Sequence, residues 1–304
     1  MTRRRTVATF LATTVLFGTA FPAIEVGLRD LPPLSFAASR YALSAALLLG
    51  YASATTDDWL PTTRGDAVAV AAGGVFLIGA TGLTFVGQQT TTSGVAAIIV
   101  SLSPVVTALF AWALLPAERP SRRGLIGVLV GFVGVAIVVR PGPLTASGST
   151  VLGRALILTA TVSLSLGTVL IRRSDHALPS PALTGWAMLV GAAIQVAGAV
   201  ALGEPAAGIV LTPAALAAVG YLGVFAGAFG FVLYFSLLDS VGPLEANLVS
   251  YLVPVVTLVT GRLLLDEAIQ PAAVVGFLVI LAGFALLKNR EIVAELARYR
   301  GAGR

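Results

Sequence analysis

The sequence predicts an all-α, polytopic membrane protein in which ten transmembrane helices form two inverted five-helix repeats, with both termini in the cytoplasm. Three observations lead to this prediction. Charged residues are only 11% of the 304 residues and hydrophobic residues are 57%, whereas a soluble domain carries about 25% charged residues. Apolar runs long enough to cross a bilayer follow one another along the chain. The chain also matches itself at a spacing of about 149 residues.

The same composition argues against several other classes of protein. Charge is too scarce to cover the surface of a soluble enzyme. The basic residues stand in short clusters between apolar runs, so we expect a lipid bilayer and a small-molecule substrate as partners and no nucleic acid. Cysteine is absent and His176 is the single histidine, so we expect no metal site and no cofactor. Lys288, the only lysine, does not belong to a P-loop.

The predicted helices are the apolar runs between breaks rich in proline, glycine and charge. A bilayer core about 30 Å thick takes roughly 20 helical residues. A cleaved signal is the alternative for the first run, but this run is longer than a signal core and no clear cleavage site closes it. The ten runs cover approximately residues 6–28, 33–52, 66–89, 93–115, 123–140, 150–171, 182–202, 213–237, 242–265 and 270–288.

Orientation follows from the distribution of basic residues, which concentrate on the cytoplasmic side of membrane proteins. A cytoplasmic amino terminus places a large majority of them inside, which predicts a multi-pass protein of the cytoplasmic membrane. The inner group is Arg3, Arg4, Arg5, Arg64, Arg119, Arg122, Arg123, Arg172, Arg173, Lys288, Arg290, Arg298, Arg300 and Arg304. The outer group is Arg29, Arg140, Arg154 and Arg262.

The internal repeat sets the predicted architecture. Residues 1–142 form the first repeat, 150–288 the second, and 289–304 a cytoplasmic tail. Five crossings leave the chain on the opposite side of the membrane, so the second repeat is inverted, as in many secondary transporters whose halves rock around a central site. The matched pairs are Gly18 with Gly167, Glu118 with Glu267, Gly127 with Gly276, Gly134 with Gly283 and, at a spacing of 150, Pro104 with Pro254.

Several motifs in this order give the chain its resemblance to a known family. They are Phe17–Phe21, Arg40-Tyr41, Ser103–Val106, Glu118, Leu166–Thr168, Val253–Val256 and Asp266-Glu267. Over roughly residues 8–288 the chain resembles the EamA-type permeases of the drug/metabolite transporter (DMT) superfamily, which carry two EamA repeats. Phe17 stands where the family often has a tryptophan.

The resemblance implies a secondary transporter of small metabolites, such as amino acids or related compounds. It also implies a cavity lined by spans 1–4 and 6–9, with spans 5 and 10 outside it. The alternatives are an exporter of drugs or toxic compounds with the same fold, or a membrane-embedded enzyme. An enzyme would need a catalytic cluster, and the carboxylates here are scattered.

Two charged residues within the apolar runs are the first candidates for the substrate pathway. A charge inside a bilayer costs about 2.5–3.5 kcal/mol on insertion scales and is usually functional. Arg40 lies seven residues past Pro33, and Glu25 lies four residues before Arg29. In the functional interpretation Arg40 binds an anionic group and Glu25 is its counter-ion or a proton acceptor. In the structural interpretation Glu25 pairs with Arg29 or with Arg40.

The remaining pathway candidates are polar, aromatic and proline residues. Glu245 is a second candidate for proton coupling, although a carboxylate in the first turn of a helix also serves as a cap. Prolines kink helices and free a backbone carbonyl, which is tolerated at depth where protein or a cavity satisfies it. Amides also bond between helices, and aromatic residues also form interface belts. The set is Tyr41, Gln88, Pro104, Gln195, Tyr234, Asn247, Tyr251 and Pro254.

Two stripes of glycine run along the predicted fifth and eighth spans. Small residues let helix backbones approach closely in a membrane. The stripe in the fifth span either supports packing within the chain or forms a homodimer contact. The stripes are Gly127, Gly131 and Gly134, and Gly220, Gly223, Gly227 and Gly230.

Overall fold

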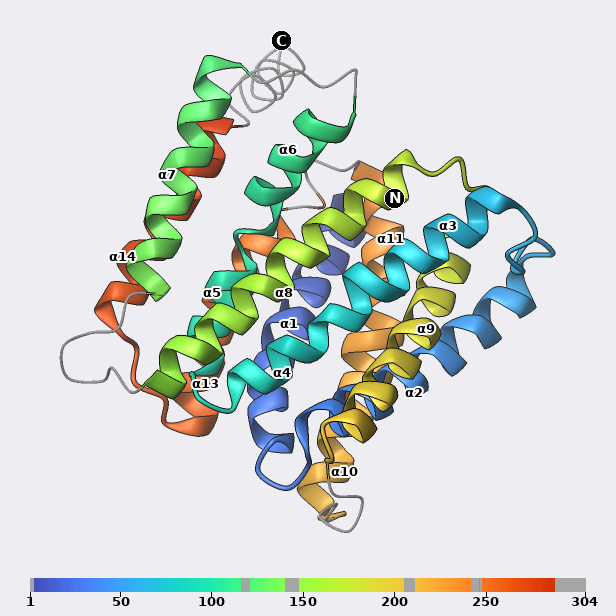
Figure 1. Cartoon of the computed structure of the whole chain (residues 1–304), viewed down its shortest axis with the longest axis horizontal. Coiled ribbons are helices and arrows are strands. Elements are labelled where there is room, and N and C mark those ends of the chain that lie inside the picture. Colours follow the sequence, from blue (N-terminus) through green and yellow to red (C-terminus); the bar gives the residue numbers. More distant parts are fainter. Residues whose placement is uncertain are drawn as a thin grey trace.

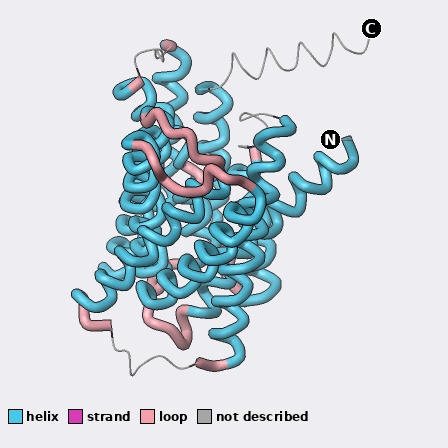
Figure 2. The backbone as a smooth tube through the Cα atoms, turned by 90° about the vertical axis from the view of Figure 1, so that its right-hand side faces the viewer, coloured by secondary structure: helices cyan, strands magenta, loops and turns pink. Residues whose placement is uncertain are grey.

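The computed structural model describes residues 3–115, 121–139, 148–204, 211–241, 246 and 248–287, and all regular structure within them is helical. The helices lie side by side, and the loops gather at two ends of the bundle (Figures 1 and 2). Several of the expected features fall outside the described residues, namely Glu118, Arg119, Arg140, Glu245, Asn247, Lys288 and the tail from 289.

Each expected apolar run contains a helical stretch whose ends differ from the prediction by a few residues. In the first half these are α1 (Arg3–Gly27), α2 (Pro33–Thr55), the continuous stretch α3 (Arg64–Ala72), η1 (Gly73–Ile78), η2 (Gly79–Thr81) and α4 (Gly82–Gln88), then α5 (Ser93–Val100), α6 (Ser103–Leu114) and α7 (Arg122–Val139). In the second half they are α8 (Gly148–Arg173), α9 (Ser180–Ala201), the continuous stretch α10 (Pro213–Gly220), η4 (Tyr221–Phe229) and α11 (Gly230–Val241), then α13 (Val249–Leu265) and α14 (Pro271–Leu287).

Within the described residues, seven stretches have the length and hydropathy to cross a membrane. They are Arg4–Gly27, Arg64–Gln88, Ser93–Leu114, Arg122–Val139, Gly148–Arg173, Ser180–Ala201 and Pro213–Leu237, and two further apolar helices, Val249–Leu265 and Pro271–Leu287, are shorter. Large apolar side chains such as Leu129 and Leu263 are mostly exposed on the outside, where lipid rather than water would cover them. The chain is therefore a multi-pass membrane protein.

The starts of the helices follow from local sequence. Proline occupies the first turn of α2, where its missing N–H costs nothing. Thr63 and Asp66 form a capping box at α3. Thr92 and Thr212 accept a backbone N–H at the starts of α5 and α10.

The runs expected as single regular helices at 66–89 and 213–237 each contain a π-helical segment instead. These segments, η1 and η4, overlap at the 149-residue spacing of the repeat, since Gly74 of η1 matches Gly223 of η4. A π-turn bonds each N–H one residue further back than an α-turn and leaves backbone groups that need other partners. The two halves of the chain therefore share a break at the same place in their third helical stretch.

The two matched prolines differ in their effect. The run at 93–115 is broken between α5 and α6, just before Pro104. Pro254, its counterpart, lies buried inside the continuous helix α13. The helix is therefore interrupted next to Pro104 and continues through Pro254.

Two helix pairs make the most extensive contacts between the halves of the chain. The first is α7 with α14, which lie side by side at one edge of the bundle (Figure 1), and the second is α2 with α9. The glycine stripe of α7 packs on α14, because a Cβ at Gly127 would lie 2.5 Å from the carbonyl oxygen of Gly283. The stripe expected to support either packing or a dimer is thus used for packing within the chain.

Candidate functional site

Arg40 lies in α2 with its guanidinium carbon 3.8 Å from the centroid of the Tyr41 ring and 5.3 Å from that of Phe85. One guanidinium nitrogen donates a hydrogen bond to the Tyr41 hydroxyl. The Arg40 Nε is buried and has no hydrogen-bond partner within the described ranges. In the described part of the chain no carboxylate pairs with Arg40, so the structure does not form the Glu25–Arg40 ion pair of the structural interpretation.

The Tyr41 hydroxyl links Arg40 to the π-helical break in the third helical stretch through a chain of hydrogen bonds. It lies 2.9 Å from the Thr81 hydroxyl, which lies 2.6 Å from the carbonyl oxygen of Ile78. The Gln195 amide, from α9, donates to the Ile78 oxygen at 2.9 Å and to the Thr81 hydroxyl at 3.3 Å. Arg40, Tyr41 and Gln195, predicted separately from the sequence, are therefore brought together.

At the second π-helical break, η4, a backbone carbonyl also accepts a hydrogen bond from a side chain. The Ser44 hydroxyl of α2 donates to the carbonyl oxygen of Gly223 in η4 at 2.8 Å and to that of Arg40 at 3.0 Å. Each π-helical segment thus has a carbonyl bonded by a side chain from the other half of the chain, by Gln195 at η1 and by Ser44 at η4. We call Arg40, Tyr41, Ser44, Thr81 and Gln195 the polar seam.

Glu25 and Gln88 lie together at another place, near the ends of α1 and α4. The Gln88 amide nitrogen donates to the Phe21 carbonyl oxygen at 2.7 Å, so the interhelical bond that was one alternative for this residue is present. Glu25 has Gln88, Glu267 and Arg29 as its interacting polar neighbours. No ion pair between Glu25 and Arg29 is formed within the described residues.

The other two predicted tyrosines, Tyr234 and Tyr251, and the two predicted prolines lie in different surroundings from Tyr41. Tyr234 of α11 lies 6.1 Å from Phe17 of α1, measured between ring centroids. Tyr251 of α13 packs on Phe284 of α14, with 4.2 Å between the ring centroids. Pro104 begins α6 and Pro254 is buried in α13, so neither of them joins the polar seam.

Sequence reasoning missed several buried polar side chains because serine and threonine are common in apolar helices. Thr257 of α13 donates to the Gly18 carbonyl oxygen at 2.7 Å. Ser165 of α8 donates to the Ser103 carbonyl oxygen at 3.0 Å. Both bonds join helices from different halves and both end near a matched Gly or Pro, which was the available signal.

Two charged residues also have roles that the sequence did not indicate. Arg154, expected as an outer topology charge, is only 4% exposed and donates to the Val138 carbonyl oxygen at 3.0 Å. Glu204 accepts the backbone N–H groups of Leu34 and Ser35 at 2.8 Å each and so caps α2. Both residues lie at helix ends, where charge alone does not reveal burial or partner.

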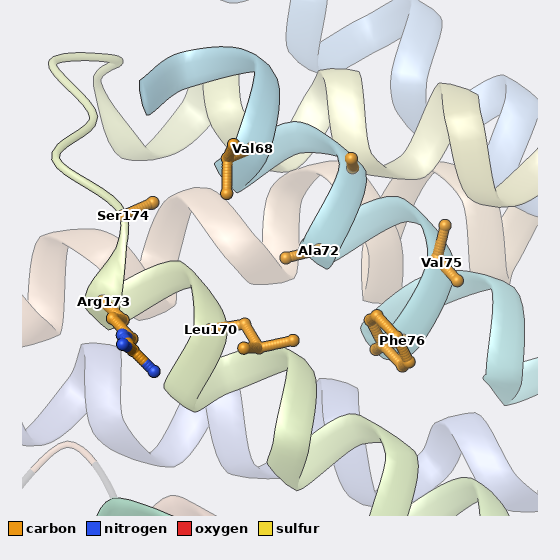
Figure 3. Close-up of a pocket in the computed structure, with 8 residues that line it drawn as sticks. Val68, Ala72, Val75, Phe76, Leu170, Arg173 and Ser174 are labelled. Carbon is orange, nitrogen blue, oxygen red and sulfur yellow. The ribbon is translucent and has the colours of Figure 1, made fainter. Parts of the chain in front are cut away.

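One cavity lies outside all of these contacts. It measures about 520 Å³ and lies between α3–η1 and α8, where apolar side chains from the two stretches face one another (Figure 3). Its polar residues are Arg173 and Ser174 at one end, and its lining residues Val68 and Val75 are about half exposed. This cavity contains none of the predicted pathway residues and is a groove on the outside of the bundle. Elsewhere too, among the described residues, no three His, Cys, Asp or Glu side chains group as metal ligands.

Comparison with known proteins gives a consistent result. The profile of the EamA-like transporter family matches residues 4–140 and again 151–288. An uncharacterized transporter of Archaeoglobus fulgidus is 27% identical, with 92% of this chain and 96% of the relative covered. The uncharacterized inner membrane transporter YedA of Escherichia coli is 26% identical, with 93% and 92% covered. A crystal structure with 21% identity superposes with a TM-score of 0.65 over 94% of this chain and 96% of the other, and so shares the fold.

Proposed function

The chain belongs to the EamA-like transporter family, and on this premise we propose that it is a secondary transporter of the cytoplasmic membrane. We propose that it moves small metabolites, such as amino acids or related compounds, by alternating access between two inverted five-helix repeats. Relatives named as transporters, matched along nearly their whole length, support a permease rather than an enzyme.

Packing between α7 and α14 supports the inversion. At the 149-residue spacing Gly276 is the counterpart of Gly127, and Gly283 is the counterpart of Gly134. A Cβ at Gly127 would meet the Gly283 oxygen at 2.5 Å, and a Cβ at Gly134 would meet the Gly276 oxygen at 2.7 Å. Each glycine therefore contacts the counterpart of the other. An antiparallel pair has this reciprocal pattern when a twofold axis runs between the helices and perpendicular to them, which for membrane-spanning helices is an axis in the membrane plane.

The helix contacts of α1 and α8 support the same relation. α1 packs on α13 and on the α10–η4–α11 stretch, whereas α8 packs on α5, α6 and the α3–η1–α4 stretch. Exchanging the two halves converts one set of contacts into the other. Alternating access by inverted repeats uses this exchange, because each half takes the other's conformation when the transporter changes its open side.

The surroundings of the Arg40 side chain are the observation on which the proposed substrate rests. A guanidinium inside an apolar bundle without a carboxylate partner is expensive unless a ligand compensates it. Arginine binds carboxylates in a two-pronged geometry, and the Tyr41 and Phe85 rings beside it hold the guanidinium in place. We therefore propose that Arg40 binds the carboxylate of the transported metabolite.

The proposal is tested by flux into proteoliposomes that contain the purified protein. We expect saturable uptake of an amino acid or organic anion, which Arg40→Met abolishes and Arg40→Lys reduces at least about tenfold. Arg262→Ala, at an exposed ion pair with Asp266, is the matched control and retains wild-type flux. Equal flux in Arg40→Met and the wild type would contradict the substrate assignment. Flux of a cationic drug that ignores Arg40 would instead support the exporter alternative.

Coupling to an ion is proposed at Glu25, which is a carboxylate within the membrane-spanning part of α1. Glu245, the other candidate, lies outside the described residues. Uptake measured with and without an imposed pH or Na⁺ gradient tests whether the flux is coupled, since a facilitator responds to neither gradient.

A further inference from the structure

Three buried oxygen atoms near the carboxyl ends of α1 and α4 have no hydrogen-bond partner among the residues that the structure describes. They are Oε2 of Glu25, Oε1 of Gln88 and Oγ1 of Thr91. Gln88 is 1% exposed and Thr91 is 9% exposed, so neither side chain is open to bulk water. A buried polar atom without a partner costs free energy, and three of them in one place indicate a ligand that all of them can share.

Several contacts place these oxygens in the same corner of the molecule. The Gln88 side chain interacts with Glu25, and its amide nitrogen bonds to the Phe21 carbonyl of α1. Thr91 lies three residues after Gln88, in the turn between α4 and α5. Helices α1, α4 and α5 contact one another pairwise.

Electrostatics in this corner favour a cation. The Glu267 carboxylate, which acts on Glu25, lies 2.9 Å from both the backbone nitrogen and the hydroxyl of Ser93 and so caps α5. Glu267, the counterpart of Glu118 in the repeat, thus binds a residue of the other half of the chain. Arg29 is the basic group that acts on Glu25, and it is exposed. The carboxyl ends of α1 and α4 add the negative ends of two helix dipoles.

We propose that this corner binds Na⁺, with the Glu25 carboxylate, the Gln88 amide oxygen and the Thr91 hydroxyl as ligands and Glu267 as a nearby counter-charge. A monovalent cation takes several oxygen ligands at once and so satisfies all three atoms. A proton on Glu25 donates a single hydrogen bond to one acceptor, and so does not draw the three oxygens to one shared partner as a cation does. Helix carboxyl ends and carbonyl oxygens bind coupling ions in other secondary transporters. The role as a coupling ion rests on the proposed transport function, whereas the binding itself does not.

The test uses the purified full-length protein in detergent, without substrate. Thermal unfolding is measured at constant ionic strength while NaCl replaces choline chloride, with KCl as a parallel series. A ligand that binds only the folded state raises Tm with its concentration, and we expect a saturable rise of about 5 °C with Na⁺. Equilibrium binding of ²²Na⁺ to the immobilised protein gives a direct second measurement.

Variants test whether the Na⁺-dependent rise in Tm comes from binding in this corner. Glu25→Gln abolishes the Na⁺-dependent rise, and Thr91→Val, which removes one oxygen at constant shape, weakens the apparent Na⁺ affinity about tenfold. Glu204→Gln is the control, because this carboxylate caps α2 elsewhere and its loss lowers Tm without removing the response to Na⁺. An equal rise in KCl or choline, a rise that persists in Glu25→Gln, or a Tm that follows pH and ignores Na⁺ would overturn the proposal. None of these outcomes depends on whether flux is observed.

Discussion

Two regions join the halves of this chain by opposite means. Between α7 and α14 the backbones meet directly, because the glycines at 127, 134, 276 and 283 leave no side chain between them; we call these four residues the glycine seam. In the polar seam, side chains of α2 and α9 bond to carbonyls at helix breaks. Close backbone packing fits one arrangement only, whereas hydroxyl and amide groups can change partners. A fixed contact and an adjustable one therefore join the same two halves of the chain.

Breaking the glycine seam should have the largest effect. Gly127→Val places a side chain against the Gly283 oxygen and the Leu287 nitrogen, which a Cβ at 127 would already approach to 2.5 and 2.7 Å. We expect a loss of about 3 kcal/mol or more, because neither backbone can move aside. Thermal unfolding monitored by size-exclusion chromatography measures it.

The control for this substitution is Gly220→Val, where nothing lies within 4 Å of a Cβ. Both changes place the same β-branched residue in a helix, so the difference between them reports the seam. Equal Tm values for the two variants would show that the glycine seam is not tightly packed.

Removing the Gln195 amide, which bonds to both Ile78 and Thr81 in the polar seam, should have an intermediate effect. Gln195 is 2% exposed, and Gln195→Leu removes the bond to the Ile78 carbonyl while retaining most of the volume. We expect a loss of about 1–2 kcal/mol, since Thr81 still bonds to the same oxygen. The measurement is thermal unfolding together with flux. A decrease in flux larger than the decrease in folded protein would indicate that the hydrogen bonds of the polar seam rearrange during transport.

The second bond of the polar seam should matter less. Ser44→Ala leaves the Gly223 carbonyl without its partner at 2.8 Å, and hydrogen bonds between membrane helices average about 0.6 kcal/mol. Because Ser44 and Gln195 share no partner, the double variant should show the sum of the two losses. A non-additive result in unfolding curves would mean that the two breaks are coupled.

A substitution outside both seams provides the baseline. Arg262 and Asp266 form an exposed ion pair with 56% and 96% of their side chains accessible. Such pairs contribute little, so Arg262→Ala should leave Tm unchanged within error. A clear shift would mean that the exposed end of α13 takes part in a contact beyond the two seams.

Much of the fold could be predicted from the sequence, because apolar runs and repeated glycines are direct consequences of a lipid solvent and close helix packing. The run at 33–52, for example, corresponds to α2, and the pair Gly127 and Gly276 marks the glycine seam. The π-helical breaks could not be predicted, since they change hydrogen bonding without changing the apolar pattern.

The candidate site was only partly predictable for a related reason. Arg40 and Gln195 stand out as polar residues in apolar runs, but their connection depends on Thr81 and on a carbonyl that only the break makes available. Tyr251 and Arg154 show that residue type alone can also suggest a role that the packing does not support. Residue type suggested a pathway tyrosine and a topology charge, whereas helix rotation turns the first toward Phe284 and buries the second.

The π-helical segments have a consequence for experiments that map surfaces. Each α-helical residue advances the side chain by about 100° around the axis, and a π-turn delays this advance. A helical wheel drawn through Arg64–Gln88 or Pro213–Val241 therefore loses its phase at η1 or η4. Because the chain contains no cysteine, single cysteines introduced into the wild type can follow this directly. Their labelling by a water-soluble reagent should show a regular period on each side of a break and a jump in phase across it.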